Sequence, residues 1–293
     1  MTMYSTAPAP GLLTAMRPRQ WAKNALVLAP LLPAARSVDL EALVGAAVAF
    51  VMFCAAASAV YLFNDVCDRE ADRAHPVKRN RPIASGVVSQ SSATVTAGLL
   101  LAGATLLAAT RGPGLVLVLL AYVGVQVAYC LGLKHEPVLE LGSVTSGFLL
   151  RAVAGGVAAG IPLSHWFLLT AGFGSLFVAA GKRYGEAVRG QRTGCQVRQV
   201  VAAYSVGYLR FVWTLAATVV VATYAQWAFE VNTETGSVWS LVSTVPFVLA
   251  VLRYAVVVDA GDGEEPETAV LGNPALLSLG ALWGCSLVLA VST

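Results

Sequence analysis

The sequence predicts an all-α polytopic membrane protein with nine transmembrane helices in a single domain, residues 1–293. Hydrophobic residues make up 57% of the chain and charged residues only 12%, whereas roughly a quarter of a soluble domain is charged. Apolar stretches of about 20 residues, long enough to cross a bilayer, recur from end to end. Lys and Arg collect in the connections on one side of these stretches. The composition therefore excludes a large soluble helical protein.

The nine expected spans follow one another between proline-containing breaks and polar loops. A tail and a short interfacial helix are expected over residues 1–20, and Pro30 and Pro33 shorten and bend the first span. The RGPG break at 111–114 separates the third span from the fourth. The spans are expected at about residues 22–35, 40–71, 91–110, 113–133, 137–159, 163–188, 199–229, 239–258 and 269–291.

The distribution of Lys and Arg orients the predicted bundle. With the N-terminus in the cytoplasm, the basic loop at 73–90 falls on the cytoplasmic face, and the opposite face keeps little more than Arg36 and Arg111. Positively charged loops stay in the cytoplasm, so the charged helix ends should face that compartment. The acidic segment 259–267 lies on the same face and is expected to be a solvated surface loop.

A stripe of oxygen-bearing side chains ends the second span. Asn64, Asp68 and Asp72 recur at i, i+4 and i+8, so they share one face of a continuous helix. Such a stripe at a membrane helix end is costly unless it holds a cation, and Mg²⁺ prefers hard oxygen ligands. Asn64 and Asp68 are the expected metal ligands, with Asp65 and Asp72 as second ligands or outer-shell partners. Surface ion pairs with the neighbouring arginines are the alternative.

Cationic residues follow this stripe directly in the sequence. Lys78 and Arg81 are placed to neutralise a diphosphate, and Pro76 and Pro82 keep their segment from being helical. Arg79 is the weakest candidate, because part of any basic run meets anionic lipid headgroups.

A second charged cluster ends the sixth span. It reads Gly-Lys-Arg-Tyr-Gly-Glu, with Lys182, Arg183 and Glu186 as candidate substrate-binding residues. Lys182 and Glu186 are four residues apart, so a simple ion pair along the helix is the alternative. A symmetric two-metal enzyme would instead place a second set of carboxylates here.

Charges inside apolar spans are candidate functional residues. Arg151 is flanked by small residues in the fifth span and is expected to contact an anion. Glu140 precedes it by about three helical turns, too far for direct contact, although a link through other groups is the structural alternative. Lys23 and Lys134 face the same side of the membrane as the two clusters.

Four ordered blocks resemble the UbiA-type intramembrane prenyltransferase superfamily. They cover nearly the whole chain and read RPRQWAKN (17–24), NDVCDREADRAHPVKRNRPIASG (64–86), SGFLLRAVAGG (146–156) and GKRYGE (181–186). Within the superfamily, the chain is most similar to the branch that transfers phosphoribose to decaprenyl phosphate. Two departures from the branch's pattern are a Glu rather than Asp at position 140 and GNPAL where the late loop commonly has an acid.

The resemblance implies a nine-helix bundle around a central cavity open to the cytoplasm, in a homotrimer in the cell membrane. It also implies a Mg²⁺-dependent transfer from 5-phosphoribosyl 1-diphosphate to decaprenyl phosphate for cell-wall arabinan precursors. The lysines at 23, 134 and 182 would hold the ribose 5-phosphate or diphosphate, Arg151 the lipid phosphate, and Tyr61 the ribose. Two alternatives remain. The first is a conventional prenyl transfer to an aromatic or lipid-soluble acceptor, and the cationic second cluster argues against it. The second is a transporter or non-catalytic binder of phosphorylated solutes.

Overall fold

The computed structural model describes residues 9–34, 38–194 and 197–292, and every regular element in these ranges is helical. The expected tail at 1–8 and Arg36 lie outside the described residues. Six helices are long and apolar enough to cross a membrane: α2 (Leu40–Cys67), α4 (Gln90–Ala109), α5 (Pro113–Leu131), α6 (Leu139–Ala159), α9 (Val206–Thr235) and α10 (Val238–Asp259).

The other expected spans take different forms. The first is a 3₁₀ helix, η1 (Pro18–Leu31), which contains Pro30 and follows the short helix α1 (Ala9–Met16). The sixth is α7 (His165–Thr193), whose second half is strongly charged, and the ninth is α12 (Pro274–Ser292), apolar from Pro274 to Ala290.

Three boundaries differ from the predictions. The second span ends at Cys67 rather than 71, and a separate helix, α3 (Arg69–Ala74), follows. The seventh is divided into α8 (Gln199–Ala202) and α9, where the Ser205 hydroxyl accepts a hydrogen bond from the Tyr208 amide and starts the second helix. The ninth begins at Pro274, after the short helix α11 (Pro266–Leu271).

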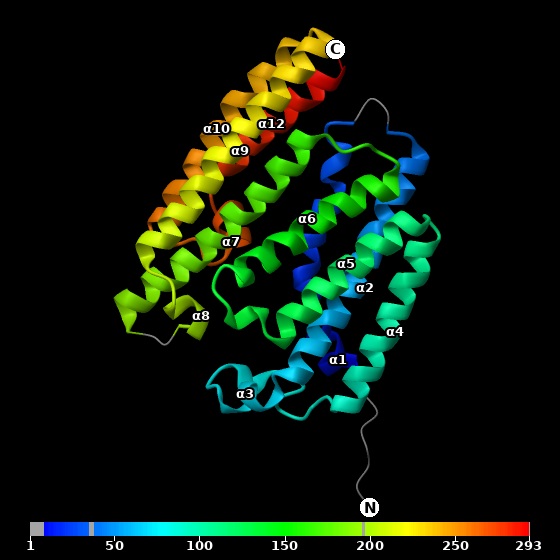
Figure 1. Cartoon of the computed structure of the whole chain (residues 1–293), viewed down its shortest axis with the longest axis vertical. Helices are drawn as coiled ribbons and strands as arrows, with labels where there is room; N and C mark the ends of the chain where they lie inside the picture. Colours follow the sequence, from blue (N-terminus) through cyan, green and yellow to red (C-terminus); the bar gives the residue numbers. More distant parts are fainter. Residues whose placement is uncertain (1–8, 35–37, 195–196, 293) are drawn as a thin grey trace, which may run out of the picture.

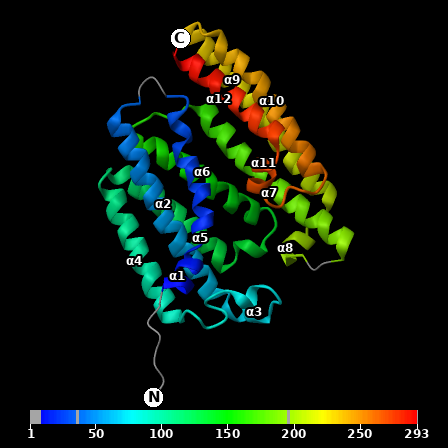
Figure 2. The ribbon, with the colours of Figure 1, turned by 180° about the vertical axis from the view of Figure 1, so that it is seen from behind.

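The long helices pack in chain order, from α2 through α4, α5, α6, α7, α9 and α10 to α12. Figures 1 and 2 show α9, α10 and α12 side by side along one flank, with α2, α4 and α5 on the other and α6 and α7 between them. The helices α1, α3 and α8 lie toward the same end of the bundle. The charged segments that bear the expected site are therefore gathered at this end.

η1 packs directly against the backbone of α6. A Cβ added at Gly155 would lie 1.8 Å from the carbonyl oxygen of Val27, so only glycine permits this approach. η1 also packs on α2. The broken first span is thus held inside the bundle by two neighbouring helices.

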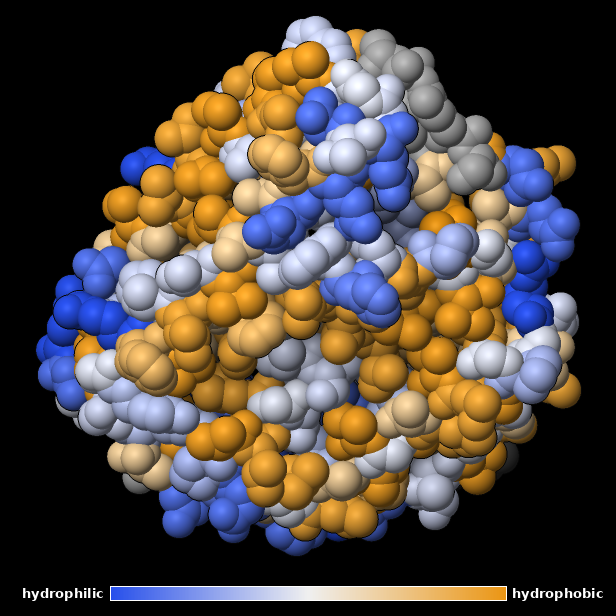
Figure 3. Space-filling model, turned by 45° about the horizontal axis from the view of Figure 1, so that its top comes forward, coloured by the Kyte–Doolittle hydropathy of each residue, from blue (hydrophilic) through white to orange (hydrophobic). Residues whose placement is uncertain are grey.

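The outer surface is apolar. Val95, Leu99 and Leu106 on α4 and Phe211 on α9 are more than half exposed, and Figure 3 shows hydrophobic residues spread over much of the visible face with hydrophilic ones in separate patches. Soluble monomers rarely expose such continuous apolar area. With six helices able to span a bilayer, the chain is a multi-pass membrane protein.

Candidate functional site

Arg81 contacts two acids seven residues apart, Asp65 and Asp72. Its Nη1 lies 3.2 Å from Asp65 Oδ1 and 2.7 Å from Asp72 Oδ2, and both carboxylates are buried. Arg17 Nη2 donates a further hydrogen bond of 2.6 Å to Asp65 Oδ1. These two acids are therefore neutralised by arginines.

The expected continuous helix over this stripe is interrupted at one residue, Asp68. Asp68 has φ −89° and ψ 4°, and the helix resumes as α3, where the Asp72 amide donates to the Asp68 carbonyl at 2.8 Å and the Asp72 carboxylate accepts from Arg81. Asn64 and Asp68 stay one turn apart, since the Asp68 amide donates to the Asn64 carbonyl at 2.9 Å. The prediction of these two as metal ligands is still compatible with their placement.

Asp68 is the more accessible acid of this group. Its side chain is 29% exposed and its Oδ1 lies 2.5 Å from Lys134 Nζ, which the loop between α5 and α6 supplies. The Asn64 side chain makes no hydrogen bond to any residue that the structure describes, and neither does that of Lys78. This group of side chains therefore has oxygen donors and a cation that a ligand can engage.

Tyr61 lies four residues, about one helical turn, before Asp65 on α2. The Arg17 guanidinium carbon is 4.9 Å from the centre of its ring, a distance typical of a cation–π contact. Tyr61 is thereby placed next to the acids, as the sequence predicts.

The second cluster is built around a buried ion pair. Arg183 Nε and Nη2 each lie 2.8 Å from an oxygen of Glu140, and neither side chain is more than 6% exposed. Glu186 pairs with Arg183 at 3.3 Å and with Arg198 at 3.4 Å. The structural alternative of a Lys182–Glu186 ion pair is thus not observed, and Glu140 reaches Arg183 rather than Arg151.

Lys23, Lys182 and Glu267 meet between η1, α7 and α11. Lys23 Nζ lies 3.4 Å from Glu267 Oε1, and Lys182 is within electrostatic reach of Lys23 and of Glu267. Burial alone would raise the pKa of Glu267, but its own backbone N–H, Lys23 and Lys182 lower it overall. As expected for segment 259–267, Glu267 is exposed to solvent, but sequence reasoning missed its ion pair because Lys23 lies on a distant element.

Arg151 is buried and uses three of its five N–H donors in hydrogen bonds inside the bundle. Its Nε donates to Asn24 Oδ1 at 2.7 Å, its Nη1 to the Gly147 carbonyl at 2.7 Å and its Nη2 to the Tyr122 hydroxyl at 3.1 Å. The guanidinium also lies 5.5 Å from the centre of the Phe53 ring. Arg151 thus ties α6 to η1, α5 and α2, and sequence reasoning did not find Asn24 or Tyr122 as its partners.

The first two clusters are close to each other through the end of α5. Tyr129 is within electrostatic reach of Arg183 and Glu140 on one side and of Lys134 on the other. Lys134 in turn contacts Asp68. The acids at the end of α2 and the cations of α7 therefore lie at the same end of the bundle and share neighbours.

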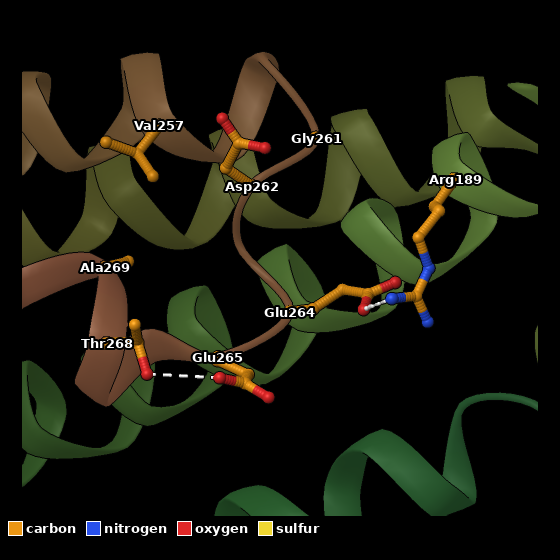
Figure 4. Close-up of a pocket in the computed structure, with 8 residues that line it drawn as sticks. All are labelled: Arg189, Val257, Gly261, Asp262, Glu264, Glu265, Thr268 and Ala269. Carbon is orange, nitrogen blue, oxygen red and sulfur yellow. Dashed lines mark hydrogen bonds and ion pairs between the residues drawn. The ribbon is translucent and has the colours of Figure 1, made fainter.

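A pocket of about 350 Å³ lies beside the acidic loop (Figure 4). Its lining includes Asp262, Glu264, Glu265 and Arg189, whose Nη1 is 2.7 Å from Glu264 Oε2. Burial raises the pKa of Glu264, and Arg189 opposes that rise. None of the expected site residues lines this pocket, so it is peripheral to the clusters described above.

Curated relatives match almost the whole chain. Decaprenyl-phosphate phosphoribosyltransferase of Mycobacterium tuberculosis is 51% identical over 96% of this chain and 94% of its own length. The protein of the same name from Corynebacterium glutamicum is 49% identical over 97% of this chain and 87% of its own length.

Solved structures show the same fold. The structure of a UbiA homolog from Archaeoglobus fulgidus bound to GPP and Mg²⁺ superposes with a TM-score of 0.70 at 16% identity, over 96% of this chain and 98% of that one. The digeranylgeranylglyceryl phosphate synthase structure superposes with a TM-score of 0.66 at 14% identity, over 98% of this chain and 99% of that one. The model of the UbiA prenyltransferase family matches residues 25–280. With this match and relatives about half identical over nearly its full length, the chain belongs to the UbiA prenyltransferase family.

Proposed function

We propose that this chain transfers phosphoribose from 5-phosphoribosyl 1-diphosphate to decaprenyl phosphate and releases diphosphate. The names of the relatives at about 50% identity support this reaction. The observation that carries it is the composition of the second cluster, where Lys182 and Arg183 stand where a conventional prenyltransferase would need further metal-binding acids. Cations on both sides of the acids suit a reaction between two phosphorylated substrates.

The reaction needs little acid–base chemistry from the protein. A phosphate monoester oxygen of the lipid is already anionic near neutral pH, so it attacks the ribose C1 without a general base. The new C1–O bond forms while the bond from C1 to the diphosphate breaks, and the diphosphate leaves with the electron pair. The barrier lies in stabilising that leaving charge.

The residues at the end of α2 fit a Mg²⁺ ion. Asn64 and Asp68 offer amide and carboxylate oxygens one turn apart, and Mg²⁺ commonly combines one or two carboxylates with substrate phosphates. The described residues contain no group of three acidic, His or Cys side chains that would enclose a metal by themselves. When bound, the ion would neutralise charge on the departing diphosphate.

The remaining residues hold the two substrates in our proposal. Lys78 and Arg81 contact the diphosphate. Lys23, Lys134 and Lys182 bind the ribose 5-phosphate or the diphosphate.

Tyr61 packs against the ribose and Arg151 faces the lipid phosphate. Asp65 and Asp72 act behind the metal ligands through the arginines that they already contact. Arg183 and Glu186 border the substrate from α7 and are oriented by Glu140 and Arg198. These roles rest on placement and charge.

We place this site on the cytoplasmic side of the cell membrane, in a homotrimer with a central cavity in each nine-helix subunit. The basic loop before α4 supports the orientation, because cytoplasmic loops are enriched in Lys and Arg. A cytoplasmic site has access to soluble sugar diphosphates. The product would supply cell-wall arabinan precursor synthesis.

The test gives membranes containing the protein labelled 5-phosphoribosyl 1-diphosphate, decaprenyl phosphate and Mg²⁺. We expect labelled lipid that requires both substrates and the divalent ion. Absence of lipid-linked phosphoribose in a preparation shown to be folded would contradict the proposal. Turnover of a prenyl diphosphate with an aromatic acceptor, in the same preparation, would support conventional prenyl transfer instead.

A further inference from the structure

A strained turn joins the two charged clusters. Val138 precedes α6 with φ +69° and ψ −48°, and the Leu139 amide donates to the Pro137 carbonyl at 2.8 Å across it. This is a γ-turn of positive φ, which is rare and strained, and for a β-branched residue it is an outlier. Strained backbone of this kind persists where the surrounding structure fixes it, often at functional sites.

Side-chain packing does not hold this turn, because the Val138 side chain is 56% exposed. A hydrogen bond from a distant loop holds it instead. The Val138 amide donates to the Tyr204 hydroxyl at 2.6 Å, and Tyr204 is itself buried between α8 and α9. Burial is the largest influence on the pKa of Tyr204 and raises it, so the hydroxyl stays neutral near physiological pH.

The turn lies between two residues of the site. Lys134 stands four residues before Val138 and contacts Asp68, while Glu140 stands two residues after it and pairs with Arg183. A change of φ and ψ at Val138 would swing one end of this segment relative to the other. The Glu140 end is held by two buried charged hydrogen bonds, so the Lys134 end, which has one partly exposed contact, would move.

We propose that Tyr204 is a positioning residue of the site: its hydroxyl fixes the turn at Val138 and thereby holds Lys134 against Asp68. Tyr204 also belongs to the connection after α7, in which Arg198 pairs with Glu186. One hydroxyl thus links the connection after α7 to the loop that carries Lys134. The inference rests on the proposed function, because Lys134 and Asp68 are its proposed substrate and metal residues.

The chain offers a matched control. Tyr208 stacks on Tyr204 with ring centres 5.6 Å apart, but among the described residues its hydroxyl has no hydrogen-bond partner. Tyr204→Phe and Tyr208→Phe therefore remove the same atom from one ring pair. Only the first removes the acceptor for Val138.

The first measurements are hydrogen–deuterium exchange over residues 135–142 and the rate of amine labelling of Lys134. In Tyr204→Phe we expect faster exchange and faster labelling than in the wild type and Tyr208→Phe. Neither measurement requires enzyme turnover, so both test the inference even if the wild type forms no lipid-linked product. Absence of that product would count against the proposed function but not against the role of Tyr204. Exchange or labelling equal to that of Tyr208→Phe would overturn the inference.

The second measurements are kinetic. We expect kcat/KM for 5-phosphoribosyl 1-diphosphate to fall about tenfold in Tyr204→Phe, with a melting temperature equal to that of Tyr208→Phe. Adding Val138→Gly to Tyr204→Phe should restore most of the activity, because glycine adopts positive φ without help. Unchanged kinetics, or a loss matched by a lower melting temperature and not rescued by glycine, would overturn the positioning role.

Discussion

Arg183 forms a bidentate ion pair with Glu140 inside the bundle: its Nε donates to Oε1 and its Nη2 to Oε2, each at 2.8 Å. Glu140 is fully buried on α6 and Arg183 is buried on α7. Such a planar two-fold contact fixes direction as well as distance. The pair therefore sets how these two helices stand relative to each other at the site end of the bundle.

Removing the charge from Glu140 should destabilise the fold strongly. Glu140→Gln leaves the Arg183 guanidinium buried without its main counter-charge, and breaking a buried pair typically costs about 3–5 kcal/mol. The loss should be visible as a lower melting temperature in detergent. Glu136→Gln, an exposed acid in the preceding loop, is the control and should change stability little. Equal melting temperatures in the two variants would contradict the structural importance of the pair.

Asp68→Asn should remove most turnover and leave the protein folded. The carboxylate is partly exposed and has one ion-pair partner, so its structural contribution is about 1 kcal/mol or less. Lipid-linked phosphoribose formation and the melting temperature are measured together over a range of Mg²⁺ concentrations. Glu70→Gln alters a nearby acid that pairs only with surface arginines and should keep full activity. If the Asp68→Asn protein is active and its activity still depends on Mg²⁺, Asp68 is not part of the site.

Gly155→Ala should damage packing, whereas Gly142→Ala should not. Both glycines lie on α6, but a Cβ at Gly155 would overlap the Val27 carbonyl of η1, while nothing lies within 4 Å of one at Gly142. Overpacking of this kind costs about 1–3 kcal/mol. At Gly142, alanine should stabilise the helix by about 0.5–1 kcal/mol. Melting temperatures that move in opposite directions would verify the prediction, and a harmless Gly155→Ala would show that η1 can shift.

Glu267 should make stability depend on pH on the acid side. Its pKa lies below the ordinary value of 4.5, because its backbone N–H, Lys23 and Lys182 together outweigh the effect of burial. A carboxyl group whose pKa is lowered by folding stabilises the fold above its ordinary pKa, and this contribution is lost as pH falls through the folded-state pKa.

Melting temperatures from about pH 7 to about pH 3 test this expectation. The wild type should lose more stability below its ordinary pKa than Glu267→Gln does, because the variant has no carboxyl group to protonate there. Glu265→Gln serves as the control, since Glu265 directly precedes α11 and its side chain accepts a hydrogen bond from Thr268 rather than contacting Lys23. Parallel curves for the wild type and Glu267→Gln would show that the ion pair with Lys23 does not contribute.

Much of the fold could be predicted, because hydropathy reports directly on membrane-spanning segments. The family resemblance is confirmed by the family match and by relatives of known name. The interruption of the helix at Asp68 and the contact of Asp72 with Arg81 could not be predicted, because both depend on the backbone angles of one residue and on the following loop.

The partners of the buried charges could not be predicted. Arg151 bonds to Asn24, 127 residues away, and no local pattern encodes that contact. Arg151, Glu140 and Arg183 could still be selected as important, since a charge in an apolar span must find a counterpart. The sequence therefore indicates which residues need partners, and the packing of helices decides which partners they obtain.

The ion pair between Lys23 and Glu267 has a consequence for how the protein is made. Lys23 leaves the ribosome 244 residues before Glu267, so the pair forms only after the helices between them have been made. Until then, Lys23 and Lys182 lack the carboxylate that balances their charge. The synthesis of α11 should thus both join this part of the chain to η1 and complete the cationic side of the site.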